Sequence, residues 1–357
     1  MLFKKTLSLI LVSSSALISC SDDIAVNNEN ENQDKVPSEV IIPVDYRYLT
    51  LNNEGYCGEE PSVSFIHKNK TIYPDYFKDV NGVQILCNPN YAFHFKDKVL
   101  LAYGSNWNDN GVALLEANSF KKVADLNIKS AMTPYNIEWL GADSVIVAGR
   151  CKDENKNAFI ADCTDGLTLK RKLDFGFTVY RMKKIGNKLY VAGCREKSNG
   201  ETLQADLLVV EIDKLHESAF KTVKSNIHLS SKFADMCIDK NGNLWFASDE
   251  GSYKLYCIDT KTDVVKHTIS MPLSMSTLNE LAYAVSNDGK IIYLRSHKAF
   301  YTVDVDNPGE LDEPVYEYRE HVGLLCDLKM TEEGNLLFVN QNQSCFSPSE
   351  VVEFSPK

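Results

Sequence analysis

The sequence lacks the local signatures of the common catalytic classes. It contains no HExxH motif, no GxSxG nucleophile elbow, no phosphate-binding P-loop and no SxDxGxxW box of the sialidases. Its seven histidines show no metal-ligand spacing, and neither CxxC nor CxxCH occurs, so thioredoxin-like chemistry and covalent haem have no support. We therefore expect no catalytic residues, no metal site and no cofactor, and a binding protein rather than an enzyme.

Long apolar runs, basic runs and long amphipathic helices are also missing. After residue 19 no segment approaches the ~20 apolar residues of a membrane helix. No cluster of Lys and Arg offsets the formal net charge of −11, so the chain would repel phosphate backbones and nucleic-acid binding is not expected. The absence of long helical periodicity argues against an α/β fold.

The N-terminus has the layout of a secretory signal peptide. Lys4 and Lys5 precede an apolar stretch from Leu7 to Ile18 that is too short to span a bilayer. The stretch ends in Leu-Ile-Ser-Cys, which looks like the lipobox of bacterial lipoproteins, in which the Cys is acylated. We expect residues 1–19 to be removed and Cys20 to carry the lipid, palmitate included, as the sole membrane anchor. A plain signal peptide with an incidental Cys is the alternative.

Residues 20–39 are rich in Asn, Asp and Glu and contain no aromatic residue. Such a composition cannot offset the entropy of ordering, so we expect a solvated, disordered tether. Its acidic character resembles the stretch that sends some lipoproteins to the outer face of the outer membrane, and we expect that location. A spacer without targeting function would look similar.

One unit recurs along residues 40–357. A tight turn leads into an apolar strand, as in IGNK before LYVAGC and KNGN before LWFAS. A polar loop, a third strand and an outer strand follow, as in KLYCIDTKTDVVKHTISMP. The turn glycines supply the positive φ that a two-residue hairpin turn requires; they are Gly141, Gly186, Gly242, Gly289 and Gly334. The central apolar positions are Thr50, Leu100, Ile146, Tyr190, Trp245, Tyr293 and Leu337.

Copies spaced 44–55 residues apart, each with four short alternating strands, are typical of propeller blades. We therefore predict an all-β chain with a single β-propeller, of seven four-stranded blades. The last copy ends after its third strand, so the segment Val40-Ile41-Ile42-Pro43-Val44 is predicted to pair there and close the ring.

Two stretches carry a resemblance to a known family. YLTLNNEGYCGEEPSVSFIHKNKTIYPDYFKDVNG resembles the opening of YncE-like surface lipoproteins, and FADMCIDKNGNLWFASDEGSYKLYCIDTKTDVVKHTISMP is similar to their middle blades. The likeness runs from Tyr46 to Phe354. The family includes BtuG-type propellers, which capture cobalamin and dock over a TonB-dependent outer-membrane transporter. The resemblance implies the same propeller fold, a corrinoid ligand and such a transporter as partner. The many cysteines and the early C-terminus depart from those relatives.

A ligand is expected on the face that carries the loops between second and third strands. Aromatic rings with scattered amides and guanidiniums suit a flat, amide-rich ligand such as a corrinoid, or a sugar. Trp107, in a polar loop between two asparagines, is the strongest candidate. The other candidates are Tyr91, Tyr135, Tyr180 and Phe233 at the starts of inner strands, and Arg150, Arg195 and Tyr253 in the loops. The alternative is that these aromatic residues cap the core between blades.

Nine cysteines remain after Cys20. Cys57, Cys87, Cys151, Cys194 and Cys345 are predicted in loops on the ligand face, whereas Cys163, Cys237, Cys257 and Cys326 are predicted in strands as buried apolar-type residues. Cys57 with Cys87, and Cys151 with Cys194, are candidate disulfides between neighbouring loops. The connectivity of disulfides cannot be read from sequence. A cluster of cysteines that binds a soft metal is the alternative.

Three functions remain open at this level. The first is capture of a small ligand, a corrinoid first, for handover to a TonB-dependent transporter. The second is an adhesion or interaction scaffold that binds a glycan or a protein. The third, a propeller lyase, needs converging titratable groups that the sequence does not reveal.

Overall fold

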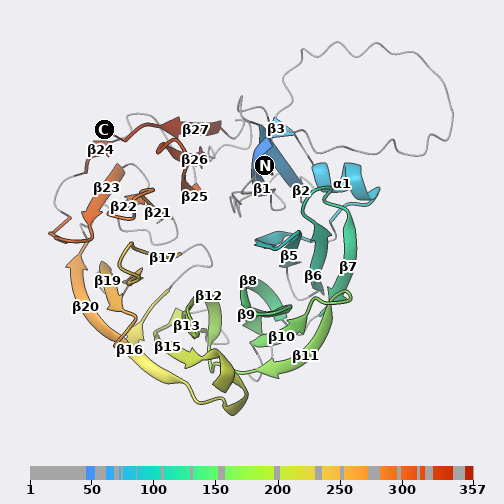
Figure 1. Ribbon diagram of the computed structural model, residues 1–357, viewed down its shortest axis with the longest axis horizontal. Helices are drawn as coiled ribbons and strands as arrows, with labels where there is room; N and C mark the ends of the chain where they lie inside the picture. Colours follow the sequence, from blue (N-terminus) through green and yellow to red (C-terminus); the bar gives the residue numbers. More distant parts are fainter. Residues whose placement is uncertain are drawn as a thin grey trace, which may run out of the picture.

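The computed structural model describes residues 46–52, 62–67, 72–73, 75–85, 87–105, 108–128, 132–151, 157–196, 202–229, 235–249, 253–271, 282–295, 299–311, 314–317, 325–340 and 350–356. The predicted signal peptide, Cys20, the tether and the predicted closing strand lie outside these residues. The described part forms seven antiparallel sheets arranged in a ring, a single all-β propeller (Figure 1). The predicted fold class and the predicted number of blades are confirmed.

The blades follow one another in chain order. Blade 1 contains β1 (Tyr46–Asn52), β2 (Ser62–His67) and β3 (Ile72–Tyr73). Blade 2 contains β4 (Pro89–Phe95), β5 (Lys98–Ser105), β6 (Asn108–Glu116) and β7 (Lys122–Asn127). Blade 3 contains β8 (Met132–Gly141), β9 (Ser144–Cys151), β10 (Ala158–Asp162) and β11 (Thr168–Leu173). Blade 4 contains β12 (Thr178–Ile185), β13 (Lys188–Glu196), β15 (Ala205–Glu211) and β16 (Lys221–Ile227), and β14 (Thr202–Leu203) pairs with β13.

Blade 5 contains β17 (Met236–Ile238), β18 (Leu244–Asp249), β19 (Tyr253–Asp259) and β20 (Val264–Ser270). Blade 6 contains β21 (Ala282–Val285), β22 (Ile291–Arg295), β23 (Ala299–Asp304) and β24 (Tyr316–Glu317). Blade 7 contains β25 (Leu325–Met330), β26 (Leu336–Asn340) and β27 (Glu350–Phe354). Four strands per blade therefore hold for blades 2 to 6, while blades 1 and 7 show three strands each among the described residues. The helices within the described ranges are short: α1 (Tyr76–Asn81), which the sequence pattern did not predict, and the 3₁₀ helix η2 (Ile212–Glu217).

The hydrophobic core lies between neighbouring blades rather than inside one sheet. Successive side chains of a strand point to opposite faces, so each central strand serves two interfaces. In β5, Leu100 and Ala102 pack against blade 3, whereas Val99 and Leu101 pack toward blade 1. A strand buried on both faces reads as a continuous apolar run, which is why VLLAYG and its repeats stand out in the sequence.

The turns between first and second strands fall into two classes. In blades 2, 3 and 4 they have two residues, as predicted, but in blades 5, 6 and 7 they have five, and there the prediction of a two-residue turn is wrong. In each five-residue turn the first side chain accepts a hydrogen bond from the backbone N–H of the last residue. The acceptors are Asp239 (2.9 Å), Ser286 (3.1 Å) and Thr331 (3.1 Å). These short polar side chains replace the missing ladder bonds. All five predicted turn glycines have positive φ.

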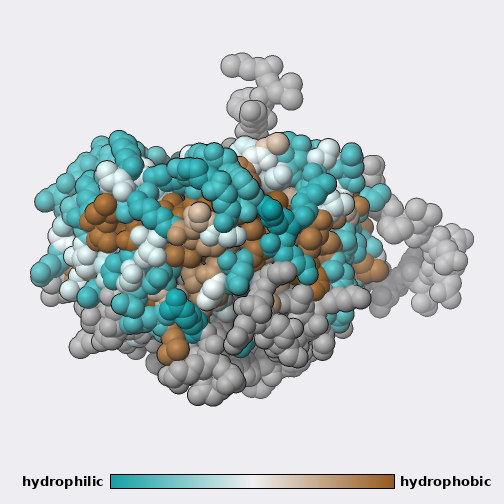
Figure 2. All heavy atoms as spheres, turned by 90° about the horizontal axis from the view of Figure 1, so that it is seen from below, coloured by the Kyte–Doolittle hydropathy of each residue, from teal (hydrophilic) through white to brown (hydrophobic). Residues whose placement is uncertain are grey.

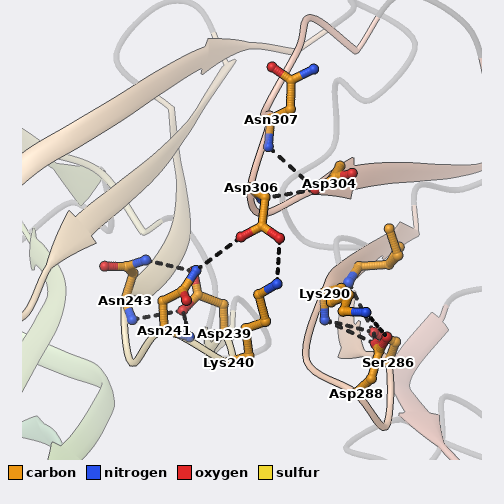
Figure 3. A network of polar contacts seen from close by, with 11 residues as sticks. Asp239, Lys240, Asn241, Asn243, Ser286, Asp288, Lys290, Asp304, Asp306 and Asn307 are labelled. Atoms are coloured by element: carbon orange, nitrogen blue, oxygen red, sulfur yellow. Dashed lines mark hydrogen bonds and ion pairs between the residues drawn. The ribbon is translucent and has the colours of Figure 1, made fainter.

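The five-residue turns also join their blades to one another (Figure 3). The backbone N–H of Lys240 donates to Gly289 O across the blade 5–blade 6 boundary at 3.1 Å. The Asp306 carboxylate accepts from Lys240 Nζ and, at 3.5 Å, from Asn241 Nδ2. The Asp239 carboxylate also accepts from Trp245 Nε1 at 2.9 Å.

The rim of the propeller is mixed in character. Figure 2 shows apolar patches on one side of the molecule, interrupted by hydrophilic residues. Among the described residues, the large apolar side chains that are more than half exposed are Val83, Val264 and Val315, and they come from different parts of the ring rather than one patch. Within the described residues no helix has the length and apolar character needed to cross a membrane.

Candidate ligand-binding site at the ring axis

The innermost strands β4, β8, β12, β17, β21 and β25 converge on the ring axis (Figure 1). Strand pairing places one residue of each innermost strand opposite the centre of its second strand: Phe93, Glu138, Lys183, Cys237, Ala284 and Lys329. Two positions earlier in blades 2 to 5 stand Tyr91, Asn136, Arg181 and Asp235. We call the following residues the axial cluster: Tyr91, Tyr135, Asn136, Glu138, Tyr180, Arg181, Lys183, Asp235 and Lys329.

A β-bulge at the start of the innermost strand places the aromatic residues of blades 3 and 4. The register shifts between Pro134 and Asn136 and between Val179 and Arg181, so Tyr135 and Tyr180 are the extra residues. The opposing residue on the second strand is a glycine in both blades. A Cβ on Gly149 would lie 2.0 Å from Thr133 O, and one on Gly193 would lie 1.8 Å from Thr178 O. The Ala-Gly pairs of VIVAGR and LYVAGC thus allow the bulges.

Arg181 stands at the centre of the cluster. Its Nη1 donates to Tyr180 O at 2.9 Å and to Tyr135 O at 3.5 Å. Its guanidinium carbon lies 5.8 Å from the ring centroid of Tyr91, which belongs to blade 2. Blades 2 and 4 are not neighbours, so these side chains meet where the innermost strands converge. The side chain of Arg181 is only 9% exposed.

Asp235 is the anionic counterpart of Arg181. Its Oδ1 lies 3.6 Å from Arg181 Nε, and its side chain is 36% exposed. Burial raises the pKa of Asp235, but the charges of Arg181, Lys329 and Lys183 outweigh this effect and the pKa is lowered. The carboxylate therefore stays ionised among many protein atoms while it still reaches solvent.

The tyrosines lie beside these charges and also pack on the core between blades: Tyr180 and Tyr135 on that of blades 4 and 5, and Tyr91 on that of blades 2 and 3. The rings of Tyr135 and Tyr180 lie 5.7 Å apart between centroids, at 39° to each other. Tyr180 is buried, and Tyr91 and Tyr135 are half-buried. Burial raises the pKa of Tyr91, so its hydroxyl is neutral and can donate a hydrogen bond.

Asn136 and Glu138 connect the innermost strands of blades 3 and 4. Asn136 Oδ1 accepts from the backbone N–H of Met182 at 3.0 Å, and Glu138 Oε2 accepts from the backbone N–H of Lys184 at 2.9 Å. Burial raises the pKa of Glu138 to about 7, against the opposing effects of Lys183 and Lys184. A carboxyl that titrates near neutrality thus lies beside the cationic side chains.

The structure brings together three of the predicted ligand residues, Tyr91, Tyr135 and Tyr180, in this cluster. Arg150 pairs with Thr133, and Tyr253 pairs with Asp249, so both lie at the end of the sheet where the innermost strands begin. Arg195 lies at the same end of blade 4 and donates from Nη1 to Gln204 O at 3.2 Å. Trp107 and Phe233 lie outside the described residues, as do Cys20 and Cys57.

The cysteine predictions are partly corrected. Cys194 lies inside β13 and is fully buried, and Cys151 is the last residue of β9, so neither is in a loop. Cys257 is a buried strand residue as predicted, whereas Cys163 is buried just after β10. Both pairings, Cys57 with Cys87 and Cys151 with Cys194, stay predictions. Among the described residues no group of three or more His, Cys, Asp or Glu side chains is placed to hold a metal ion.

Sequence reasoning missed the charged members of the axial cluster, Glu138, Arg181, Lys183, Asp235 and Lys329. Isolated charges in a strand read as solvent-facing positions. The blade alignment itself carried the missing signal, because polar residues occupy equivalent positions on innermost strands whose other faces are apolar.

Comparison with known proteins confirms the fold. No known protein family and no curated protein matches the sequence. Among solved structures, a quinoprotein alcohol dehydrogenase-like protein from Bacteroides thetaiotaomicron is similar at 15% identity over 83% of this chain and 71% of that chain, with a TM-score of 0.65. The WD40 β-propeller domain of Doa1 is similar at 12% identity over 88% and 93%, with a TM-score of 0.53.

A third neighbour is the dihydro-haem d1 dehydrogenase NirN, solved in complex with DHE. It is similar at 13% identity over 82% of this chain and 62% of that chain, with a TM-score of 0.50. At these identities the comparisons bear on architecture alone. Fold and neighbours together define the protein as a β-propeller.

Proposed function

We propose that this propeller binds a flat small molecule at the axial cluster, and that the ligand is a corrinoid. The observation that supports this most is that the guanidinium of Arg181 lies beside the ring of Tyr91 and bonds to the backbone carbonyls of Tyr135 and Tyr180. Aromatic faces offer large contact area at low entropic cost, and a few polar groups fix the orientation of the bound molecule. The cluster has both.

Two further observations favour a macrocyclic ligand. The resemblance of the opening and middle blades to YncE-like lipoproteins, with their BtuG-type members, implies a corrinoid. One structural neighbour, NirN, was solved in complex with DHE and is named for its action on a dihydro-haem, which is also a tetrapyrrole macrocycle. We propose binding without catalysis.

The sequence of the N-terminus supports a place for this binding. With a lipobox at Cys20 and an acidic tether after it, we propose that the protein is held by its lipid at the outer surface of the outer membrane. A captured ligand would then be handed to a TonB-dependent transporter.

The test is co-elution of purified protein with cyanocobalamin in gel filtration, recorded by visible absorbance. Tyr135→Ala should reduce the bound ligand at least about tenfold, because it removes one aromatic face of the cluster. Trp139→Ala is the matched control, since it removes a larger ring from the opposite end of the same strand, β8, and should leave binding unchanged. A colourless protein peak would contradict the corrinoid and favour a glycan or protein partner, which a polysaccharide panel would then identify.

A further inference from the structure

The axial cluster is cationic in an acidic protein. Arg181, Lys183 and Lys329 together act on the carboxylate of Asp235, while Glu138 is only half ionised near neutral pH. Among the described members of the cluster, three cations thus stand with one full and one partial negative charge, although the formal net charge of the chain is −11. Opposite signs attract strongly where water is partly excluded, so this local surplus favours an anion.

Two buried donors in the cluster have no acceptor at hydrogen-bond distance among the described residues: Arg181 Nε and Asn136 Nδ2. The amide of Asn136 also interacts with the hydroxyl of Tyr91, so Arg181 Nε is the donor that most needs a partner. Asn136 is fully buried and Arg181 is 8% exposed. A buried donor without an acceptor costs about 1–3 kcal/mol, so such groups call for a partner that the protein itself does not supply. The side chain of Lys183, half-buried two positions beyond Arg181 on β12, forms no hydrogen bond or ion pair with the described side chains.

We propose that the axial cluster binds an oxyanion group of the ligand, a phosphate or carboxylate, between Arg181 and Lys183, with the amide of Asn136 as a further donor. The inference rests on the proposed ligand-binding function. It adds that the part of the ligand bound between Arg181 and Lys183 carries a negative charge. Arginine suits the role because its planar fork matches the oxygens of both groups. In a corrinoid the group is the phosphodiester of the nucleotide loop.

Asp235 sets the selectivity of this site. Its oxygen stands 3.6 Å from Arg181 Nε, beyond hydrogen-bond distance, and its side chain already reaches solvent. An oxyanion that accepts from Nε competes with the Asp235 carboxylate for the charge of Arg181. A neutral ligand gains nothing from displacing this carboxylate.

Isothermal titration of the full chain with two corrinoids tests the proposal. Cyanocobalamin carries the phosphodiester and dicyanocobinamide lacks it. We expect cyanocobalamin to bind at least about tenfold more tightly. Lys183→Gln should remove most of this difference by weakening cyanocobalamin alone. Arg171→Gln, an exposed position of β11, is the matched control and should keep the difference. Arg181→Gln should act like Lys183→Gln, and circular dichroism shows whether that variant folds.

The outcomes separate this inference from the proposed function. Equal affinity for both corrinoids would overturn the oxyanion site and leave corrinoid binding intact. Failure of both corrinoids, with inorganic phosphate bound in a Lys183-dependent manner, would support the site and overturn the corrinoid. No binding of any of the three probes would overturn both.

Discussion

At the scale of single residues, burial of Glu138 in the axial cluster disfavours its ionised form. This carboxyl is 7% exposed and is faced by Lys183 and Lys184 on β12, by Asp235 before β17, and by the phenol of Tyr91 on β4. Burial outweighs the two lysines, so the folded protein favours the protonated form. The pKa rises from 4.5 to about 7.

This shift predicts a pH-dependent stability. Because the folded pKa lies above the unfolded one, the contribution of Glu138 is fully present below about pH 4.5 and is lost as pH rises through 7. Glu138→Gln keeps an acceptor for Lys184 N–H but does not titrate. Between pH 4.5 and pH 8, the free energy of unfolding of this variant should rise by about 3 kcal/mol relative to that of the parent protein. Urea unfolding at several pH values measures this difference. For Glu332→Gln, at an exposed position, the plot of unfolding free energy against pH should be parallel to that of the parent protein. A parallel plot for Glu138→Gln would contradict the raised pKa of Glu138.

At the scale of the element, the five-residue turns predict a difference between two glycines. Gly242 and Gly289 have similar φ values, +80° and +71°. A Cβ on Gly242 meets nothing within 4 Å, whereas one on Gly289 would lie 2.6 Å from Lys240 Cβ and 2.9 Å from its Cα. Gly242→Ala should therefore cost about 1–2 kcal/mol for the left-handed backbone alone. Gly289→Ala should cost about 1–3 kcal/mol more, since the blade 5–blade 6 contact must shift.

Thermal unfolding of the two alanine variants measures this difference directly. Equal losses would show that the turn of blade 6 does not press on Lys240. The comparison is matched because both glycines occupy the same position of equivalent turns, so the backbone cost cancels.

The turns also show where sequence reasoning reaches its limit within an element. The positive φ of their glycines could be predicted, because a turn that needs the left-handed region is a local feature. The two turn lengths could not be predicted, because the point at which a strand ends depends on its hydrogen bonds to the partner strand. The helix α1 could not be predicted either, because its stability depends on contacts outside its own segment. Tyr76 and Phe77 pack in a cluster that includes Val99 and Leu115 of blade 2.

At the scale of the whole molecule, the ring explains why the fold could be predicted and the site only in part. Every interface from blade 1 to blade 6 joins consecutive copies, so the repeat alone specifies the packing. The axial cluster joins residues of blades that are not neighbours, such as Tyr91 and Arg181. That juxtaposition follows from the curvature of the ring, which no single copy encodes. The tyrosines were found through their repeated position, and Arg181 was not.

The last prediction concerns where the whole molecule resides. If Cys20 carries the lipid anchor, Cys20→Ala should move the protein from the membrane fraction to the soluble fraction, measured by ultracentrifugation of broken cells and immunoblotting. Several acyl chains bury enough CH₂ groups, at about 0.8 kcal/mol each, to hold a propeller of this size at a bilayer, and none remains in the variant. Cys163→Ala, at a buried thiol in blade 3, is the matched control and should stay with the membranes. Retention of Cys20→Ala in the membrane fraction would sink the lipoprotein assignment, and ligand capture would then need another route to the cell surface.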